Sequence, residues 1–145
     1  MPVTYILDTC VFNRLLDERI RLDEISPDGP FAATHVQLDE LQATPMRHVN
    51  RRDELIAAFN EVGPGLFPTE SFCFDVSHLD IDKWGSGQLF SKLKTCLDAK
   101  RKKPNNTHDA LIAEVAIVQK FTLVTSDRSL AEAAEEYGAK VLRIP

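Results

Sequence analysis

Residues 3–16 read VTYILDTCVFNRLL, and this stretch indicates the fold class. Val3 to Leu7 is a short apolar run of the kind found in a buried strand, and it ends at Asp8. Apolar residues then recur at the spacing of one helix face, at Val11, Leu15, Leu16, Ile20 and Leu22. The stretch therefore predicts a buried strand that passes directly into an amphipathic helix.

The same alternation continues along the chain. Further strands are predicted at residues 31–36, 72–76, 121–124 and 141–144, and helical patterns at residues 38–59, 79–103, 110–118 and 130–137. Pro45 should break the first of these helices, residues 63–68 should form a loop, and Thr107 should cap the helix that follows it. Strands that alternate with helices predict one α/β domain, residues 1–145, around a mainly parallel sheet.

Composition narrows the class of protein. With 43% hydrophobic and 27% charged residues, the 145-residue chain should be globular rather than disordered or fibrous. A net charge of −5 excludes an overall basic coat for nucleic acid, although a local basic patch is compatible with it. Three cysteines without CxxC spacing favour a reducing compartment. The first residues match neither a signal peptide nor a membrane span, so we expect a soluble, unprocessed, cytoplasmic protein.

Two predicted strands end close to an aspartate, Asp8 after YIL and Asp127 after LVTS. Open parallel sheets place their active sites beyond the carboxyl ends of the strands, so these two side chains should lie near each other. Each aspartate could equally be the N-cap of the helix that follows.

Two further acids lie at predicted helix starts, Glu40 in THVQLDEL and Asp109 in NNTHDALIAEVA. Acids in a first helical turn also stabilise the helix dipole, by about 0.3–1 kcal/mol, which is the alternative explanation for both. Spacing alone does not choose between Glu40 and its neighbour Asp39. Four carboxylates in one concavity would raise one another's pKa values, and a hard divalent cation such as Mg²⁺ or Mn²⁺ would relieve that repulsion.

The segments ILDTCVFNRLLD, QLDEL, NNTHDALIAEVA and FTLVTSDRSL, in this order, resemble the PIN-domain family, most closely its bacterial VapC-type toxin ribonucleases. The resemblance implies a three-layer α/β/α fold with four or five strands and an acid cluster that binds Mg²⁺ or Mn²⁺. It chooses Glu40 over Asp39, because the family's acid directly precedes the residue that is Leu41 here. The implied catalytic and metal-binding acids are Asp8, Glu40, Asp109 and Asp127, with the hydroxyls of Thr9 and Thr125 beside them.

The function implied by the resemblance is metal-dependent endoribonuclease activity, as the toxin of a toxin–antitoxin pair. A small antitoxin protein would then be a partner, and a homodimer is expected. A bound ion can activate water for in-line attack and neutralise the phosphate. Two alternatives remain: a nuclease acting on DNA or structured nucleic acid, because the same acids cut either polymer, and a non-catalytic PIN-like module that only binds nucleic acid.

Two basic clusters are candidates for gripping RNA phosphates. They consist of Lys100, Arg101, Lys102 and Lys103, and of Arg47, His48, Arg51 and Arg52. Solvated cations at a helix C-terminus explain the first cluster equally well. His108 is expected beside the metal-binding acids rather than on the ion, and Cys10 is expected to pack as a small hydrophobic residue.

Overall fold

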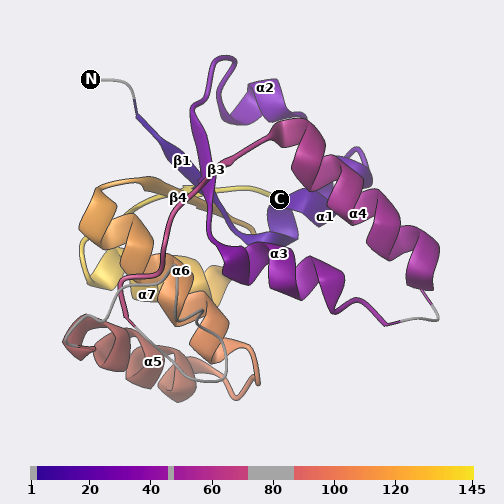
Figure 1. Cartoon of the computed structure of the whole chain (residues 1–145). Helices are drawn as coiled ribbons and strands as arrows, with labels where there is room; N and C mark the ends of the chain where they lie inside the picture. Colours follow the sequence, from indigo (N-terminus) through magenta and orange to yellow (C-terminus); the bar gives the residue numbers. More distant parts are fainter. Residues whose placement is uncertain (1–2, 46–47, 72–86) are drawn as a thin grey trace.

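The structure is a computed structural model of the chain, and it describes residues 3–45, 48–71 and 87–145. Its sheet has five strands in the order β3-β2-β1-β4-β5, and every pair of neighbours is parallel (Figure 1). The strands are β1 (Tyr5–Leu7), β2 (Phe31–Ala33), β3 (Gly65–Leu66), β4 (Thr122–Thr125) and β5 (Lys140–Arg143). The predicted parallel sheet is therefore confirmed, with β1 at its centre.

Helices cover both faces of this sheet. They are α1 (Thr9–Leu16), α2 (Leu22–Ile25), α3 (His35–Gln42), α4 (Val49–Val62), α5 (Gln88–Lys100), α6 (Asn106–Gln119) and α7 (Arg128–Glu136). One hydrophobic core lies between the sheet and α5, α6 and α7, and the other between the sheet and α1, α2 and α4 (Figure 1). This is the predicted three-layer α/β/α arrangement. No helix in the described part of the chain is long and apolar enough to span a bilayer.

Successive residues of a central strand pack into the two hydrophobic cores on opposite faces of the sheet. Ile6 packs into the core beneath α6, and Leu7 into the core beneath α1. Leu123 and Val124 divide in the same way, and all four side chains are fully buried. Because both faces of the central strands are covered, these strands appear in the sequence as continuous apolar runs rather than as an alternating pattern.

Several element boundaries differ from the predicted ones. The strand predicted over residues 31–36 ends at Ala33, because Thr34 and Gln37 form a capping box that starts α3. The loop predicted at residues 63–68 contains the short edge strand β3. Helix α6 begins at Asn106 with Asn105 at its N-cap, so Thr107 is not the cap.

Two further boundary predictions concern the middle of the chain. The break at Pro45 is confirmed, since α3 ends at Gln42 and α4 begins at Val49. The helix predicted to reach Lys103 ends at Lys100. The strand predicted at residues 72–76 and the first part of the helix predicted at residues 79–103 lie outside the described residues.

Candidate functional site

The carboxyl ends of β1 and β4 bring two of the predicted acids together. Leu7 pairs with Val124 in the sheet, and the N–H of Asp8 donates to the Val124 carbonyl at 3.0 Å. The Thr125 hydroxyl donates to Asp8 Oδ2 at 2.7 Å and accepts from the Asp127 N–H at 2.9 Å. This buried hydroxyl therefore links the ends of the two strands and orients the Asp8 carboxylate.

Asp8 and Asp127 are also helix N-caps, and each uses its two carboxylate oxygens differently. Asp8 Oδ1 accepts from the Thr9 N–H at 2.8 Å, and its Oδ2 receives Thr125. Asp127 Oδ1 accepts from the Leu130 N–H at 3.1 Å, and its Oδ2 faces Arg101. The capping role and a role in a shared site are therefore compatible, because they involve different oxygens.

Helix α3 carries Glu40 toward these aspartates. The buried Gln37 amide donates to the Leu7 carbonyl at 3.0 Å, which fixes α3 against the end of β1. The Glu40 side chain is 18% exposed, and its Oε1 lies 3.4 Å from His108 Nδ1. This contact raises the pKa of His108. His108 therefore lies beside Glu40, and its expected place near a bound ion stays a prediction.

Asp39 faces another direction. Its side chain is 42% exposed and lies 3.0 Å from His35 Nδ1, one turn earlier on α3. Of the two adjacent acids, Glu40 is the one whose charge acts on Asp8 and Asp109.

Asp109 lies in the first turn of α6 and is almost completely buried. Burial, followed by repulsion from Asp8 and Glu40, raises its pKa to about 8. Burial also raises the pKa of Asp8, against the opposing effect of its hydrogen bonds from Thr125 and Cys10. Four carboxylates from four separate elements thus act on one another at this edge of the sheet, and we call Asp8, Glu40, Asp109 and Asp127 the acid cluster.

The acid cluster has the chemistry of a site for a hard cation. Its donors are carboxylate oxygens, and it concentrates negative charge away from solvent. Thr9 Oγ1 is buried without a hydrogen-bond partner, and the buried Glu40 Oε1 has the 3.4 Å contact with His108 Nδ1. As they stand, however, no three His, Cys, Asp or Glu side chains within the described ranges are arranged to hold an ion.

A side chain of the protein itself lies among the acids. The Arg101 guanidinium donates through Nη2 to Asp109 and through Nη1 to Asp127, and its Nε donates to Asn106 Oδ1 at 2.9 Å. Burial alone would raise the pKa of Asp127, but hydrogen bonds from Arg101 and from the Leu130 N–H lower it. The sequence grouped Arg101 with RNA-binding cations, whereas its side chain is 10% exposed and turned inward.

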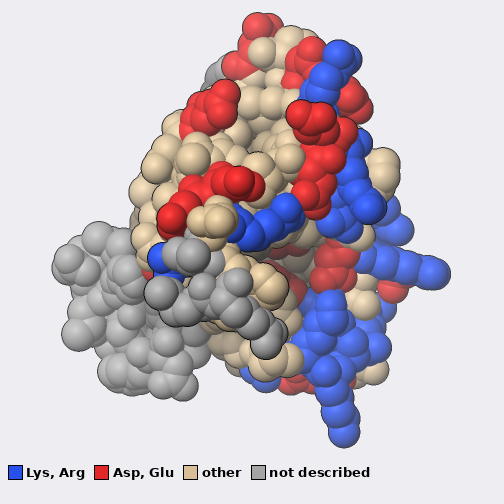
Figure 2. All heavy atoms as spheres, turned by 90° about the vertical axis from the view of Figure 1, so that its right-hand side faces the viewer, with Lys and Arg blue, Asp and Glu red and all other residues tan. Residues whose placement is uncertain are grey.

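The other predicted phosphate-binding residues lie on several surfaces. Lys100 pairs with Glu132 at 3.3 Å, Lys103 Nζ is 3.9 Å from Asp127, and Lys102 is exposed. On α4, Arg51 pairs with Asp17 at 2.7 Å and Arg52 with Asp53 at 3.6 Å, while Arg47 lies outside the described residues. Figure 2 shows one face of the molecule. Lys and Arg side chains gather along its right-hand side and lower right, with acidic side chains between and above them.

Two polar residues of the site were missed by sequence reasoning. The Cys10 thiol donates to Asp8 Oδ2 at 3.3 Å and accepts from the Ser126 N–H at 3.4 Å, so it is more than a packing residue. Burial and the Asp8 charge raise its pKa to about 12, which keeps the thiol protonated. Asn106 was overlooked inside the NNTHD motif, and the only signal for it is its position at the start of α6.

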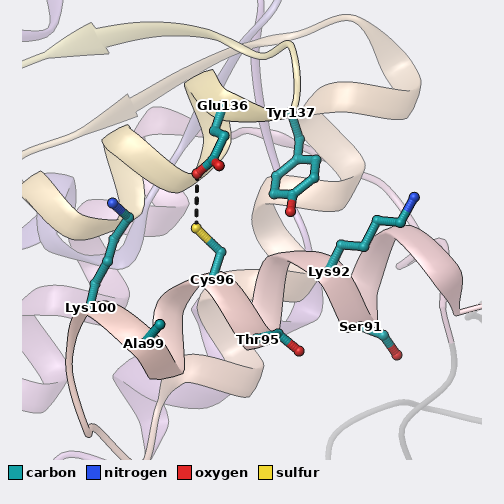
Figure 3. A pocket seen from close by; sticks show the side chains of 8 residues that line it. All are labelled: Ser91, Lys92, Thr95, Cys96, Ala99, Lys100, Glu136 and Tyr137. Carbon is teal, nitrogen blue, oxygen red and sulfur yellow. Dashed lines mark hydrogen bonds between the residues drawn. The ribbon is translucent and has the colours of Figure 1, made fainter.

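Two hollows meet at Glu40. One, of about 390 Å³, runs past Thr9 and Arg51, and the other, of about 480 Å³, runs past Pro104 and His108. A third hollow of about 510 Å³ lies elsewhere, between α5 and α7, where the Cys96 thiol donates to Glu136 (Figure 3). No member of the acid cluster lines this third hollow, whereas Glu40 lines both of the first two.

Comparison with known proteins identifies the fold. No family model and no curated protein matches the sequence. Solved structures do match: VapBC2 from Rickettsia felis bound to a promoter DNA fragment (18% identity, 98% of this chain, 99% of that chain, TM-score 0.61) and VapBC-5 from Mycobacterium tuberculosis (22%, 99%, 100%, 0.53). FitAcB from Neisseria gonorrhoeae matches at 13% identity over 97% of each chain, with a TM-score of 0.51. The chain therefore has the PIN-domain fold of these toxin structures, as its sequence motifs predicted.

Proposed function

We propose that the chain is a metal-dependent endoribonuclease whose active site is the acid cluster. The observation that carries the proposal is the convergence of four carboxylates from four elements at the carboxyl edge of a PIN-domain sheet. Burial and then repulsion from neighbouring acids raise the pKa values of Asp8 and Asp109, which fits a site that is completed by a cation, because a bound ion favours the charged carboxylates.

Asp8, Glu40, Asp109 and Asp127 are the residues that would hold Mg²⁺ or Mn²⁺. Such an ion would supply an activated water and neutralise charge on the scissile phosphate. The protein's own contribution is orientation: the Thr125 hydroxyl fixes Asp8. The Gln37 amide fixes the helix that carries Glu40.

The hollows on either side of Glu40 suggest how an RNA strand would lie. A strand that passes from the hollow near Arg51 to the hollow near His108 would cross Glu40, which lines both. The exposed Lys102 and Lys103 follow α5, with Lys103 3.9 Å from Asp127, and they would contact phosphates there.

A small antitoxin protein is the partner that we propose. The basis is the structural likeness to VapBC-5, which is described as a member of the VapBC family of toxin–antitoxin systems. The homodimer implied by the sequence resemblance stays a prediction.

The decisive assay uses end-labelled single-stranded RNA and a DNA of the same sequence, with Mn²⁺, with Mg²⁺ or with EDTA. We expect ion-dependent cleavage of the RNA by the wild type and by Asp39→Asn. We expect the rate of RNA cleavage to fall at least 100-fold in Glu40→Gln. This variant replaces a carboxylate by an amide, as Asp39→Asn does, but at the next residue. Equal cleavage of the DNA would favour the broader nuclease, and RNA binding without cleavage at any ion concentration would favour a non-catalytic module.

A further inference from the structure

Arg101 bonds the same oxygens that a metal ion would need. Its two terminal nitrogens donate to Oδ2 of Asp109 and to Oδ2 of Asp127. A divalent ion of this class binds carboxylate oxygens at about 2.0–2.1 Å, inside the space that a hydrogen-bonded guanidinium nitrogen occupies. Arg101 and an ion that approaches these two oxygens from the same side therefore compete for them.

A network of hydrogen bonds holds Arg101 in this position. Its Nε donates to Oδ1 of Asn106, which is 1% exposed. The Asn106 amide nitrogen in turn donates to Asp98 Oδ1 at 2.8 Å and to the Arg101 carbonyl at 3.2 Å. The guanidinium is thus placed by a buried partner, which distinguishes it from a surface cation that happens to lie near an acid.

The position of Arg101 in the chain lets its side chain leave without unfolding the site. It is the first residue after α5 and has an extended backbone, at the start of the connection to α6. Rotation about its long side chain would move the guanidinium out of the cluster while α5, α6 and the acids stay in place.

One guanidinium does not neutralise the acids around it. Its bonds go to Asp109 and Asp127, whereas Asp8 accepts from Thr125 and Glu40 lies beside His108. A divalent ion brings twice the charge of a guanidinium to the same oxygens, so exchange of one for the other is electrostatically favourable.

We propose that Arg101 is an internal counter-ion of the acid cluster which a divalent ion must displace, and that it thereby sets how much Mg²⁺ or Mn²⁺ the protein requires. This inference rests on the proposed function in one respect, that the acid cluster is the ion site. It adds that the protein regulates this site with a residue of its own.

Calorimetric titration with Mn²⁺ tests the proposal on the wild type, Arg101→Gln and Lys102→Gln. Lys102 is the matched control, because it is the next residue, it is exposed, and its replacement changes the net charge equally. We expect Arg101→Gln to bind Mn²⁺ at least tenfold more tightly than the wild type, and Lys102→Gln to stay within twofold of it. Equal or weaker binding in Arg101→Gln would overturn the proposal.

A second measurement follows the side chain itself. The Arg101 Nε–H signal in the nuclear magnetic resonance spectrum, assigned by its absence from Arg101→Gln, should move when Mg²⁺ is added and return with EDTA. A signal that stays unchanged at saturating Mg²⁺ would also overturn the proposal. If metal-dependent RNA cleavage persists while either test fails, the nuclease function stands without this inference. If no variant binds an ion, both fail.

Discussion

Replacement of Asp109 by asparagine should stabilise the ion-free protein at pH 8 but not near pH 4. Its pKa is raised from the usual 3.8 to about 8, so the folded chain retains a proton that the unfolded chain releases. The stability associated with this group is therefore present below about pH 4 and is lost progressively as the pH rises to about 8. At about 1.4 kcal/mol per tenfold change in proton affinity, the upper limit is roughly 6 kcal/mol.

The measured gain should be smaller, because the variant also removes one of the two carboxylates bonded to Arg101. A hydrogen bond to a charged group contributes about 1.5–3 kcal/mol, so the net gain at pH 8 should be at most about 4 kcal/mol. Urea unfolding followed by circular dichroism, in EDTA buffers from pH 4.5 to 8.5, gives the free energy of unfolding for the wild type and Asp109→Asn. Asp39→Asn, which makes the same change outside the cluster, is the control. A variant that is less stable than the wild type by the same amount at every pH would refute the reasoning.

Two further predictions concern the supports of the site and its rim. Thr125→Val should lower the free energy of unfolding by about 2 kcal/mol, because it removes a buried hydroxyl that bonds both Asp8 and the Asp127 backbone. Thr125→Ser should retain most of that stability in the same urea titration, and equal losses in the two variants would contradict the role of the hydroxyl. Replacing Lys102 and Lys103 together by glutamine should reduce the slope of log K for RNA binding against log salt by roughly 0.7 per lost phosphate contact. An unchanged slope in filter-binding measurements would assign RNA capture to the Arg51 side.

The central strands could be predicted because a strand that is buried on both faces consists of consecutive apolar residues. The strands at residues 5–7 and 122–125 are runs of apolar residues that serve two cores at once. Strand β3 has no such run, since Gly65 and Leu66 are both exposed at the edge of the sheet. It pairs with β2 through backbone groups, whose pairing does not depend on side-chain pattern.

The choice between Asp39 and Glu40 shows where spacing stops being informative. Adjacent residues on a helix point about 100° apart, so one of them had to face the aspartates, but the helix could be rotated either way on spacing alone. Its rotation follows from the Gln37 bond to the end of β1, a contact across 30 residues of sequence. Only the resemblance to PIN domains favoured Glu40 beforehand.

The sequence could not predict that Arg101 has a different role from its neighbours. Four consecutive cations look alike in the sequence, although their side chains have different partners in the structure. Lys100 pairs with Glu132 on α7, Lys102 is exposed, and Arg101 turns to Asp109 and Asp127. The physical reason is that a planar guanidinium donates two hydrogen bonds at once to separate carboxylates, which an ammonium does less well. The charge of a buried cluster of acids can be neutralised by a metal ion or by a nearby arginine. The search for an ion site in a sequence should therefore ask which arginine lies close enough to compete for it.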